Sequence, residues 1–123
     1  SGEVFVSYLD TVLSLDQTKH LVVSNLAVAF ARGVAVVGHG VANLELSSLS
    51  LANHGASALS LSNASNSLVT AIHAFNIGCA AMHVDGGDVP SLTPGNVTVS
   101  GCKIYDYALW KRTYQAGISW GGV

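Results

Sequence analysis

The chain has 123 residues, of which half are hydrophobic, 7% aromatic and only 10% charged. Its formal net charge of −2 provides no electrostatic attraction to nucleic acid or to an anionic membrane. No apolar run approaches the roughly 18 residues of a membrane-spanning helix, so we expect no membrane span. The length allows one domain, which we expect to cover residues 1–123.

A short stretch near the start of the sequence resembles part of a repeat. The stretch 12–15, which reads Val-Leu-Ser-Leu, alternates apolar and polar residues in a way that recurs later in the chain. Four copies of a related sequence segment follow, and they begin at His20, Asn43, Asn66 and Asn96. The first three copies start 23 residues apart, and an extra seven residues precede the fourth. A fixed period of 20 to 50 residues is typical of solenoid proteins.

Apolar residues alternate with polar ones inside each copy, as Leu44 and Leu46 or Leu49 and Leu51 show. A period of two residues predicts strands that bury one face. Serine, asparagine and glycine divide each copy into three such strands, and no stretch shows helical periodicity. We therefore expect an all-β fold, a parallel β-helix (solenoid) of about four rungs with three short strands each.

Aligning the copies places similar side chains at equivalent positions, which predicts continuous inward columns along the solenoid axis. The predicted columns are Leu26, Leu49, Ile72 and Cys102; Val28, Leu51, Ala74 and Ile104; Leu13, Val36, Leu59, Met82 and Ile118; and Leu15, Leu61, Val84 and Trp120.

The corners of the predicted rungs also repeat, and most of them carry asparagine. Asparagine and aspartate tolerate left-handed φ angles, and stacked asparagine side chains can hydrogen-bond from rung to rung. A structural role is therefore expected at the residues that open the copies (His20, Asn43, Asn66 and Asn96) and at those that close the second strand (Asn53, Asn76 and Asp106).

The two cysteines lie at different points of the repeat. Cys102 aligns with Ile72 and Leu49, whereas Cys79 aligns with Ala56. We expect both to be small buried hydrophobic residues and not a disulfide. No Cys-x-x-Cys motif or Cys/His cluster indicates a metal site, so no metal or other cofactor is expected.

Two segments interrupt the repeat. Residues 83–95 carry the extra residues before the fourth copy, and residues 107–117 lengthen the turn within that copy. Insertions in a solenoid repeat form loops, often on the binding face. Six of the twelve charged residues fall between 85 and 112, close to several aromatic residues.

Charged and aromatic side chains in the same segment suit a carbohydrate site, because sugar rings stack on aromatic faces and charged groups bind hydroxyls or carboxylates. A pair of carboxylates could also serve as acid and base on a glycosidic bond, although no catalytic residue is assigned. The candidate carbohydrate-binding residues are Asp85, Asp88, Trp110, Lys111, Arg112 and Tyr114.

Other interpretations of these residues remain open. Arg112 could pair with Asp85 or Asp88 and tie the two loops to the solenoid wall. Asp85 and Asp88 flank two glycines, so calcium is an alternative ligand of that turn. Two sequons, at Asn63 and Asn96, fall at turns where N-glycosylation is feasible and would accompany an extracellular or cell-surface location.

Several segments together resemble a known group of proteins. The residues 31–33, 86–88, 92–96, 102–107 and 110–114 are similar to the right-handed parallel β-helix proteins of the pectate-lyase-like superfamily. This group includes glycoside hydrolases and polysaccharide lyases. The resemblance implies a right-handed solenoid that binds or processes a polysaccharide outside the cell, with the catalytic carboxylates largely on further rungs.

A structural role is the alternative function. The chain begins without methionine, and it begins and ends in the middle of a rung, so we expect it to be a segment of a longer solenoid or to stack on a partner. Stacking of rungs from end to end would build an assembly module of a cell-surface or extracellular filament without catalytic activity. The expected partners are thus a polysaccharide or glycan and, on the open ends, further rungs or another chain.

Overall fold

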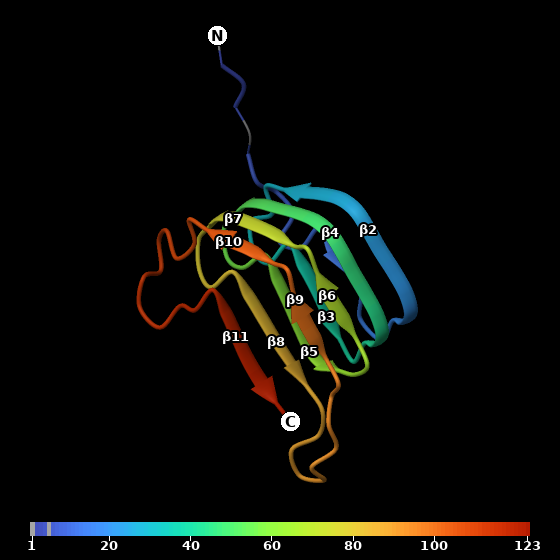
Figure 1. Cartoon of the computed structure of the whole chain (residues 1–123). Coiled ribbons are helices and arrows are strands. Elements are labelled where there is room, and N and C mark those ends of the chain that lie inside the picture. The colour runs from blue at the N-terminus through green and yellow to red at the C-terminus, as the bar shows by residue number, and fades with distance from the viewer. Residues whose placement is uncertain (1, 5) are drawn as a thin grey trace.

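The computed structural model shows an all-β solenoid of about three turns (Figure 1). It describes residues 2–4 and 6–123, so Ser1 and Phe5 of the predicted segment 1–123 lie outside the described residues. Within the described part of the chain there is no helix, and hence none that is long and apolar enough to cross a membrane. The predicted all-β parallel solenoid is confirmed.

Two parallel sheets form the walls of the solenoid. Sheet A has the strand order β1-β3-β5-β8-β11. Its strands are β1 (Leu13–Ser14), β3 (Val36–His39), β5 (Leu59–Ala64), β8 (Met82–Gly86) and β11 (Ile118–Gly122).

Sheet B has the order β10-β7-β4-β6-β9, and β2 pairs with β4. Its strands are β2 (Lys19–Ala29), β4 (Ala42–His54), β6 (Leu68–Thr70), β7 (His73–Ile77), β9 (Thr98–Ser100) and β10 (Lys103–Tyr105). Each strand of both sheets pairs with the equivalent strand of the next rung.

The register follows the sequence repeat. Leu13 pairs with Val36, Val36 with Leu59, Leu59 with Met82, and Met82 with Ile118. The column of Val28, Leu51, Ala74 and Ile104 is in register in the same way. The middle members of these columns are fully buried, so the core is a continuous stack of small aliphatic side chains between the two sheets.

The division into three short strands holds for only part of the molecule. In the first two copies the first and second predicted strands are one continuous strand, 11 residues in β2 and 13 in β4. A bend with positive φ is nevertheless present at the predicted break in every copy, at Asn25, Ser48, Ala71 and Gly101. The backbone ladder continues through this bend in β2 and β4. The predicted count of about four rungs is not confirmed, since the solenoid makes about three turns.

The asparagine corners are as the repeat predicts. Positive φ angles, which asparagine tolerates better than most residues, occur at all seven predicted corners (His20, Asn43, Asn66, Asn96, Asn53, Asn76 and Asp106). Asn76 Nδ2 donates to Asn53 Oδ1 at 3.0 Å, and Asn96 Nδ2 donates to Asn66 Oδ1 at 3.3 Å. These bonds hold one rung to the next along the outside of the corners.

Both cysteines are free, as expected. They are half-buried and not fully buried. Cys102 packs on the edge of the core, and its thiol lies 3.5 Å from the Ser100 carbonyl oxygen. Cys102 is less covered than the equivalent Leu49 and Ile72 because no further rung lies over it in this structure.

One histidine is part of the buried core. His54 ends β4, is only 3% exposed, and its Nδ1 accepts a hydrogen bond of 3.2 Å from the Ala31 backbone amide. Its Nε2 is buried and makes no hydrogen bond of good geometry within the described residues. Burial lowers the pKa of His54 from 6.5 to about 4, and the nearby Val28 carbonyl opposes this shift only in part.

Buried His54 predicts that the protein loses stability in mild acid. The unfolded chain binds a proton at this histidine below pH 6.5, whereas the folded chain does so only near pH 4. The free energy of unfolding should therefore fall by about 3 kcal/mol between these two pH values. Chemical denaturation at a series of pH values measures this loss.

Two variants isolate the contribution of His54. His54→Asn keeps an acceptor for the Ala31 amide but does not titrate, so it should lose most of the dependence on pH in this window. His83→Asn changes an exposed histidine and should retain the wild-type dependence. Equal slopes for wild type and His54→Asn would contradict the prediction.

Candidate functional site

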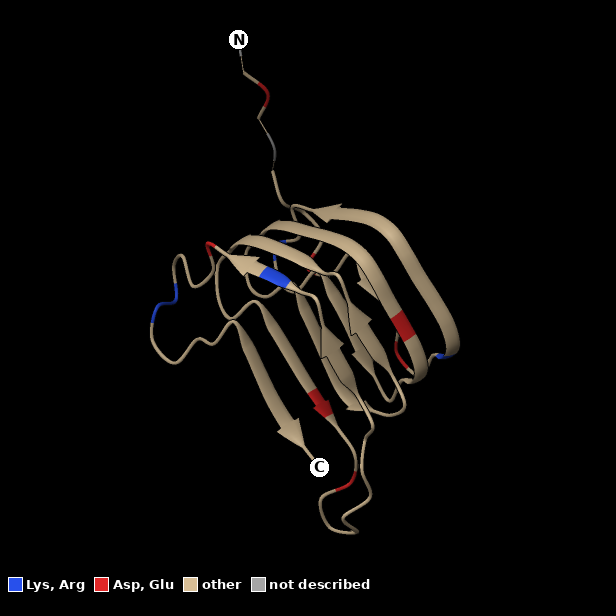
Figure 2. Ribbon diagram, in the orientation of Figure 1, with Lys and Arg blue, Asp and Glu red and all other residues tan. Residues whose placement is uncertain are grey.

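The two loops that interrupt the repeat lie at opposite ends of the strands of sheet A. Residues 106–117 lead into β11, and the carbonyls of Ala116 and Gly117 accept bonds from Ala81 and Met82 at the beginning of β8. Residues 87–95 follow the end of β8. Figures 1 and 2 show the two loops on separate sides of the molecule. The predicted carbohydrate-binding residues are therefore not brought together in one site.

Asp88 stabilises its own loop. Its Oδ2 accepts a 3.0 Å hydrogen bond from the Ser91 backbone amide and a second bond from the Ser91 hydroxyl. The backbones of Asp88 and Thr93 are joined by two hydrogen bonds of 2.9 and 3.1 Å. The Asp88 carboxylate thus closes a tight turn instead of pairing with Arg112.

Asp85 is half-buried on β8, where it lies beside Gly121 of β11. A Cβ atom at Gly121 would lie 3.1 Å from Asp85 Oδ1, so the glycine leaves room for the carboxylate. Within the described part of the chain, no three His, Cys, Asp or Glu side chains lie close enough together to hold a metal ion. Asp85 and Asp88 therefore have separate structural surroundings: Asp85 lies beside Gly121, and Asp88 binds Ser91.

Trp110 fixes the loop of residues 106–117 to the solenoid corner. Its indole Nε1 donates a 2.6 Å hydrogen bond to the Gly55 carbonyl. A Cβ atom at Gly78 would come within 2.5 Å of the indole ring and within 2.1 Å of the Gly55 carbonyl oxygen, so only glycine fits beneath the ring. The backbone amides of Trp110 and Lys111 both donate to the Gly78 carbonyl. One edge of the ring is held in this way while 72% of the residue is exposed.

The remaining loop candidates point into solvent. Tyr114 is fully exposed, and Lys111 and Arg112 are exposed and form no ion pair within the described residues. The ion pair that the structure shows joins Arg32 Nε and Asp10 Oδ1 at 2.7 Å on the opposite end of the solenoid. The hydrogen bond and positive charge of Arg32 lower the pKa of Asp10. The predicted tethering of the two loops by Arg112 is therefore wrong.

A cluster of rings lies on the outward face of sheet B, where β7 and β10 run side by side. Phe75 and Tyr105 stack with ring centroids 5.2 Å apart and planes 8° from parallel. His73 lies against both rings, and a hydrogen bond of 3.1 Å joins His73 Nε2 and the Tyr105 hydroxyl. Lys103 Nζ lies 5.6 Å from the centre of the Tyr105 ring. We call His73, Phe75, Lys103 and Tyr105 the ring cluster.

The register of sheet B produces the ring cluster. His73 pairs with Lys103, and Phe75 pairs with Tyr105. On the preceding rung the equivalent positions are Ser50 and Ala52, which carry short side chains. The rings of Phe75 and Tyr105 therefore have short side chains next to them on the preceding rung, and Ala52, which pairs with Phe75, is buried.

Sequence reasoning overlooked the ring cluster as a unit, although a signal for it was present. Aligning Asn66 with Asn96 places Phe75 opposite Tyr105, just as it places His73 opposite Lys103. The charged residues between 85 and 112 predict a site on the two loops, whereas the aligned outward positions of the strands indicate this cluster. Tyr105 lies within that interval, but Phe75 lies outside it.

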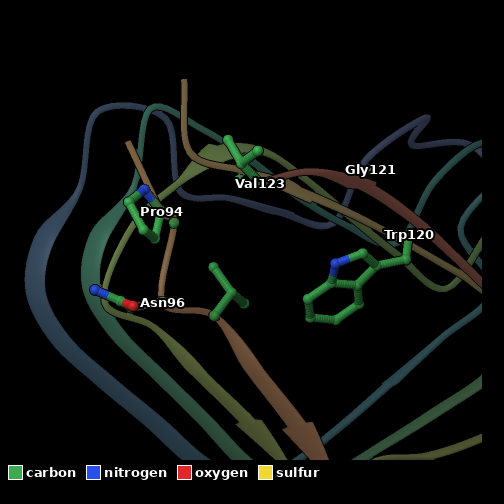
Figure 3. Close-up of a pocket in the computed structure, with 8 residues that line it drawn as sticks. Pro94, Asn96, Trp120, Gly121 and Val123 are labelled. Atoms are coloured by element: carbon green, nitrogen blue, oxygen red, sulfur yellow. The ribbon is translucent and has the colours of Figure 1, made fainter. Parts of the chain in front are cut away.

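A cavity of about 250 Å³ opens at the last rung (Figure 3). Its lining is mainly apolar side chains and backbone. Figure 3 shows the Trp120 indole on one side and Pro94 with Val123 on the other, while the Asn96 amide points away from the cavity. The lining residues are Gly86, Pro94, Gly95, Asn96, Val97, Trp120, Gly121 and Val123. The cavity lacks charged side chains, so it suits an apolar group and not a sugar hydroxyl cluster.

The two sequon asparagines differ in their surroundings. Both are exposed and both have positive φ angles. The Asn96 side chain donates to Asn66 and borders the cavity. Asn63 lies within β5 on the side wall. A glycan on Asn96 would replace one of the two hydrogens of the Nδ2 atom that donates to Asn66, whereas no rung-to-rung bond of the Asn63 side chain is present among the described residues.

Comparison of the chain with models of protein families, with curated proteins and with solved structures found no match.

The role of Trp110 predicts that a small change will loosen the loop. Trp110→Phe keeps an aromatic ring but loses the bond to the Gly55 carbonyl, which is worth about 1 kcal/mol. The loop should then open about five-fold more often, and trypsin should cleave after Lys111 or Arg112 correspondingly faster. Limited proteolysis under native conditions, followed by mass spectrometry, measures the rate.

Tyr114→Phe is the matched control for this experiment, because Tyr114 lies in the same loop and is fully exposed. It should be cleaved at the wild-type rate. If Trp110→Phe were cleaved no faster than Tyr114→Phe, the hydrogen bond to Gly55 would not hold the loop.

Proposed function

We propose that the chain binds a carbohydrate through the ring cluster on the outward face of sheet B. The observation that supports this proposal is the stacked, partly exposed pair of Phe75 and Tyr105, with His73 and Lys103 beside it. A sugar ring has apolar faces that pack on aromatic rings and hydroxyl groups that need donors and acceptors. The four residues of the ring cluster provide both the apolar ring faces and the hydrogen-bonding groups.

Each member of the cluster has a distinct role in this proposal. Phe75 and Tyr105 provide the apolar surface on which a sugar face packs. The hydrogen bond between His73 and Tyr105 holds the phenol in one orientation, which reduces the entropy lost when a ligand binds. Lys103 is exposed and carries a positive charge toward a hydroxyl or a carboxylate of the ligand.

An extended ligand would approach the cluster from its exposed side. On the preceding rungs the positions equivalent to Phe75 carry Ala52, which is buried, and Ala29, which is exposed. The sugar contacts in this proposal are therefore those made to the rings themselves and to Lys103. The loop of residues 106–117 continues directly from β10, and the backbone amides of Trp110 and Lys111 donate to the Gly78 carbonyl just after β7. Trp110, Lys111 and the adjoining Arg112 therefore border the same end of sheet B.

The superfamily, the handedness, the location outside the cell and the glycosylation of Asn63 are also part of this proposal. The parallel solenoid agrees with membership in the pectate-lyase-like superfamily, and right-handed winding is expected because crossovers between parallel strands are nearly always right-handed. Binding of a polysaccharide would place the chain outside the cell or on its surface, where Asn63 could carry a glycan. The proposal concerns binding and assigns no catalytic group.

Replacement of one ring tests the proposed function. The wild-type chain is applied to an array of neutral and acidic polysaccharides, and the affinity for a bound glycan is then measured by titration calorimetry. Tyr105→Ala should weaken binding about ten-fold, because a lost ring contact costs about 1.4 kcal/mol. The variant should still fold, since Tyr105 is partly exposed at the end of β10.

Tyr114→Ala is the matched control, because it removes the same side chain from the neighbouring loop. It should bind as the wild type does. A larger effect of Tyr114→Ala than of Tyr105→Ala would move the site to the loop, and the absence of any bound glycan would reject the proposed function altogether.

A further inference from the structure

Three polar residues occupy the same outward position on successive rungs of sheet A. Asp16, His39 and Ser62 are each separated by 23 residues, which is the period of the repeat. His39 and Ser62 are paired in register on β3 and β5, and Asp16 lies on the preceding rung beside His39. Both β3 and β5 have a neighbouring strand on each edge, so this position belongs to the side wall and not to an end of the solenoid.

A hydrogen bond joins the histidine and the serine. His39 Nδ1 and Ser62 Oγ lie 2.8 Å apart. When the imidazole carries its proton on Nε2, Nδ1 is the acceptor and the serine hydroxyl donates to it. His39 is exposed and Ser62 is half-buried, so small molecules in solution can reach the pair. A serine hydroxyl that donates to an adjacent imidazole has the geometry of a nucleophile and its general base.

Asp16 holds the backbone that carries the histidine. Its Oδ1 accepts a 3.1 Å hydrogen bond from the His39 backbone amide. The His39 carbonyl accepts a 2.7 Å bond from the backbone amide of Gln17. Both backbone groups of His39 are thereby fixed to the preceding rung. The carboxylate binds the backbone and not the imidazole, so His39 and Ser62 form a dyad.

The strand that carries Ser62 is irregular at this point. Between Leu61 and Ala64 the register with β8 shifts by one residue, as in a β-bulge. Asn63 has a φ angle of 50° and is exposed, although it directly follows the outward Ser62. The usual alternation of inward and outward residues is broken here, and two consecutive side chains face outward. Bulges redirect side chains in this way and are frequent beside active sites.

The bulge places an amide group beside the serine. The side chain of Asn63 forms no hydrogen bond within the described residues, so its Nδ2 hydrogens are available to a ligand. A donor next to a nucleophile can bind the negative oxygen that develops when the nucleophile attacks a carbonyl group. Nucleophile, base and oxyanion donor are thus neighbours on one wall of the solenoid.

The surroundings of the pair limit the substrate. The Gln17 carboxamide fills the space over Gly40, where even a Cβ atom would overlap with it, and so bounds the site next to His39. This crowded edge favours a short acyl group. Asp16 lies on one side of the pair and Asp85 on the next rung on the other side. Two carboxylates favour a neutral substrate over an anionic one.

We infer that Ser62 is the nucleophile of an esterase site that accepts neutral carboxylic esters with a short acyl group. His39 is the general base, and Asn63 donates to the oxyanion. This activity does not rest on carbohydrate binding, because the site lies on sheet A and the ring cluster lies on sheet B.

The reaction has two steps. Ser62 Oγ attacks the carbonyl carbon of the ester while its proton moves to His39 Nδ1, and the alcohol leaves with that proton when the ester C–O bond breaks. Water then attacks the acyl-serine and gives a proton to His39, and the carboxylic acid is released as this proton returns to Ser62 Oγ. The net change is the hydrolysis of one ester bond by one water molecule.

A fluorophosphonate probe, which bonds covalently to activated serine hydroxyls, tests the inference. The chain is produced without glycosylation, because a glycan on Asn63 would occupy its amide. The wild type should be labelled at Ser62, as mass spectrometry of its peptides shows, and should hydrolyse 4-nitrophenyl acetate. Ser62→Ala should do neither. His39→Gln should lower both rates about 100-fold because the general base is lost.

Asn63→Gly tests the oxyanion donor. Glycine tolerates the positive φ angle at this position, so the change removes only the amide group. Ester hydrolysis should fall about 100-fold, the usual effect of losing one oxyanion donor. Circular dichroism and thermal unfolding establish that each variant is folded.

Ser60→Ala and Tyr105→Ala are the matched controls. Ser60 is the neighbouring outward residue of β5, and its partner in register is His83, to which its hydroxyl forms no hydrogen bond within the described residues. Tyr105 belongs to the ring cluster. Both controls should be labelled at Ser62 and should hydrolyse the ester at the wild-type rate.

Four results would overturn the inference. The first is a wild type that is not labelled at Ser62, or is labelled equally at Ser60. The second is a Ser62→Ala variant with the wild-type rate of hydrolysis, because a histidine would then react with the ester directly. The third is a His39→Gln variant that is labelled at the wild-type rate, because Ser62 would then need no base. The fourth is an Asn63→Gly variant with the wild-type rate, which would remove the oxyanion donor from the site.

Discussion

The structure depends on one constraint, the stacking of equivalent side chains in register along the axis. Because successive rungs are separated by 23 residues over most of the chain, Leu59 packs between Val36 and Met82, its own counterparts in the neighbouring copies. A residue's surroundings are thus set by its position in the repeat. The same constraint acts on the outer surface, where it brings Phe75 beside Tyr105 and His73 beside Lys103. Core and candidate site are two results of one register.

The repeat allowed the solenoid to be predicted in considerable detail. The inward columns, the left-handed corners and the hydrogen bond between Asn53 and Asn76 all follow from aligning the copies. The continuity of β2 and β4 was missed because a polar residue with positive φ, such as Asn25, bends the strand without ending its ladder. The predicted site residues lie apart for a different reason. Closeness along the chain suggested that Asp88 and Arg112 lie together, yet one loop follows a strand of sheet A and the other follows a strand of sheet B.

The side wall and the end faces present different chemistry. The wall carries polar residues and the ring cluster, whereas the ends expose aliphatic side chains and strand edges. Their directions differ by about a right angle, since the wall faces outward and the ends face along the axis.

The placement of β4 has a consequence for how the molecule opens. This strand is the longest of the solenoid, and neighbouring rungs pair with both of its edges. In a structure built by nearest-neighbour stacking, local unfolding proceeds inward from the ends, because a terminal rung loses one set of contacts and an internal rung loses two. The backbone amides of β4 should accordingly be the last to exchange their hydrogen with solvent, while those of β10 and β11 exchange early. Resistance to opening thus rises toward the middle of the chain, even though every rung is built from the same pattern of residues.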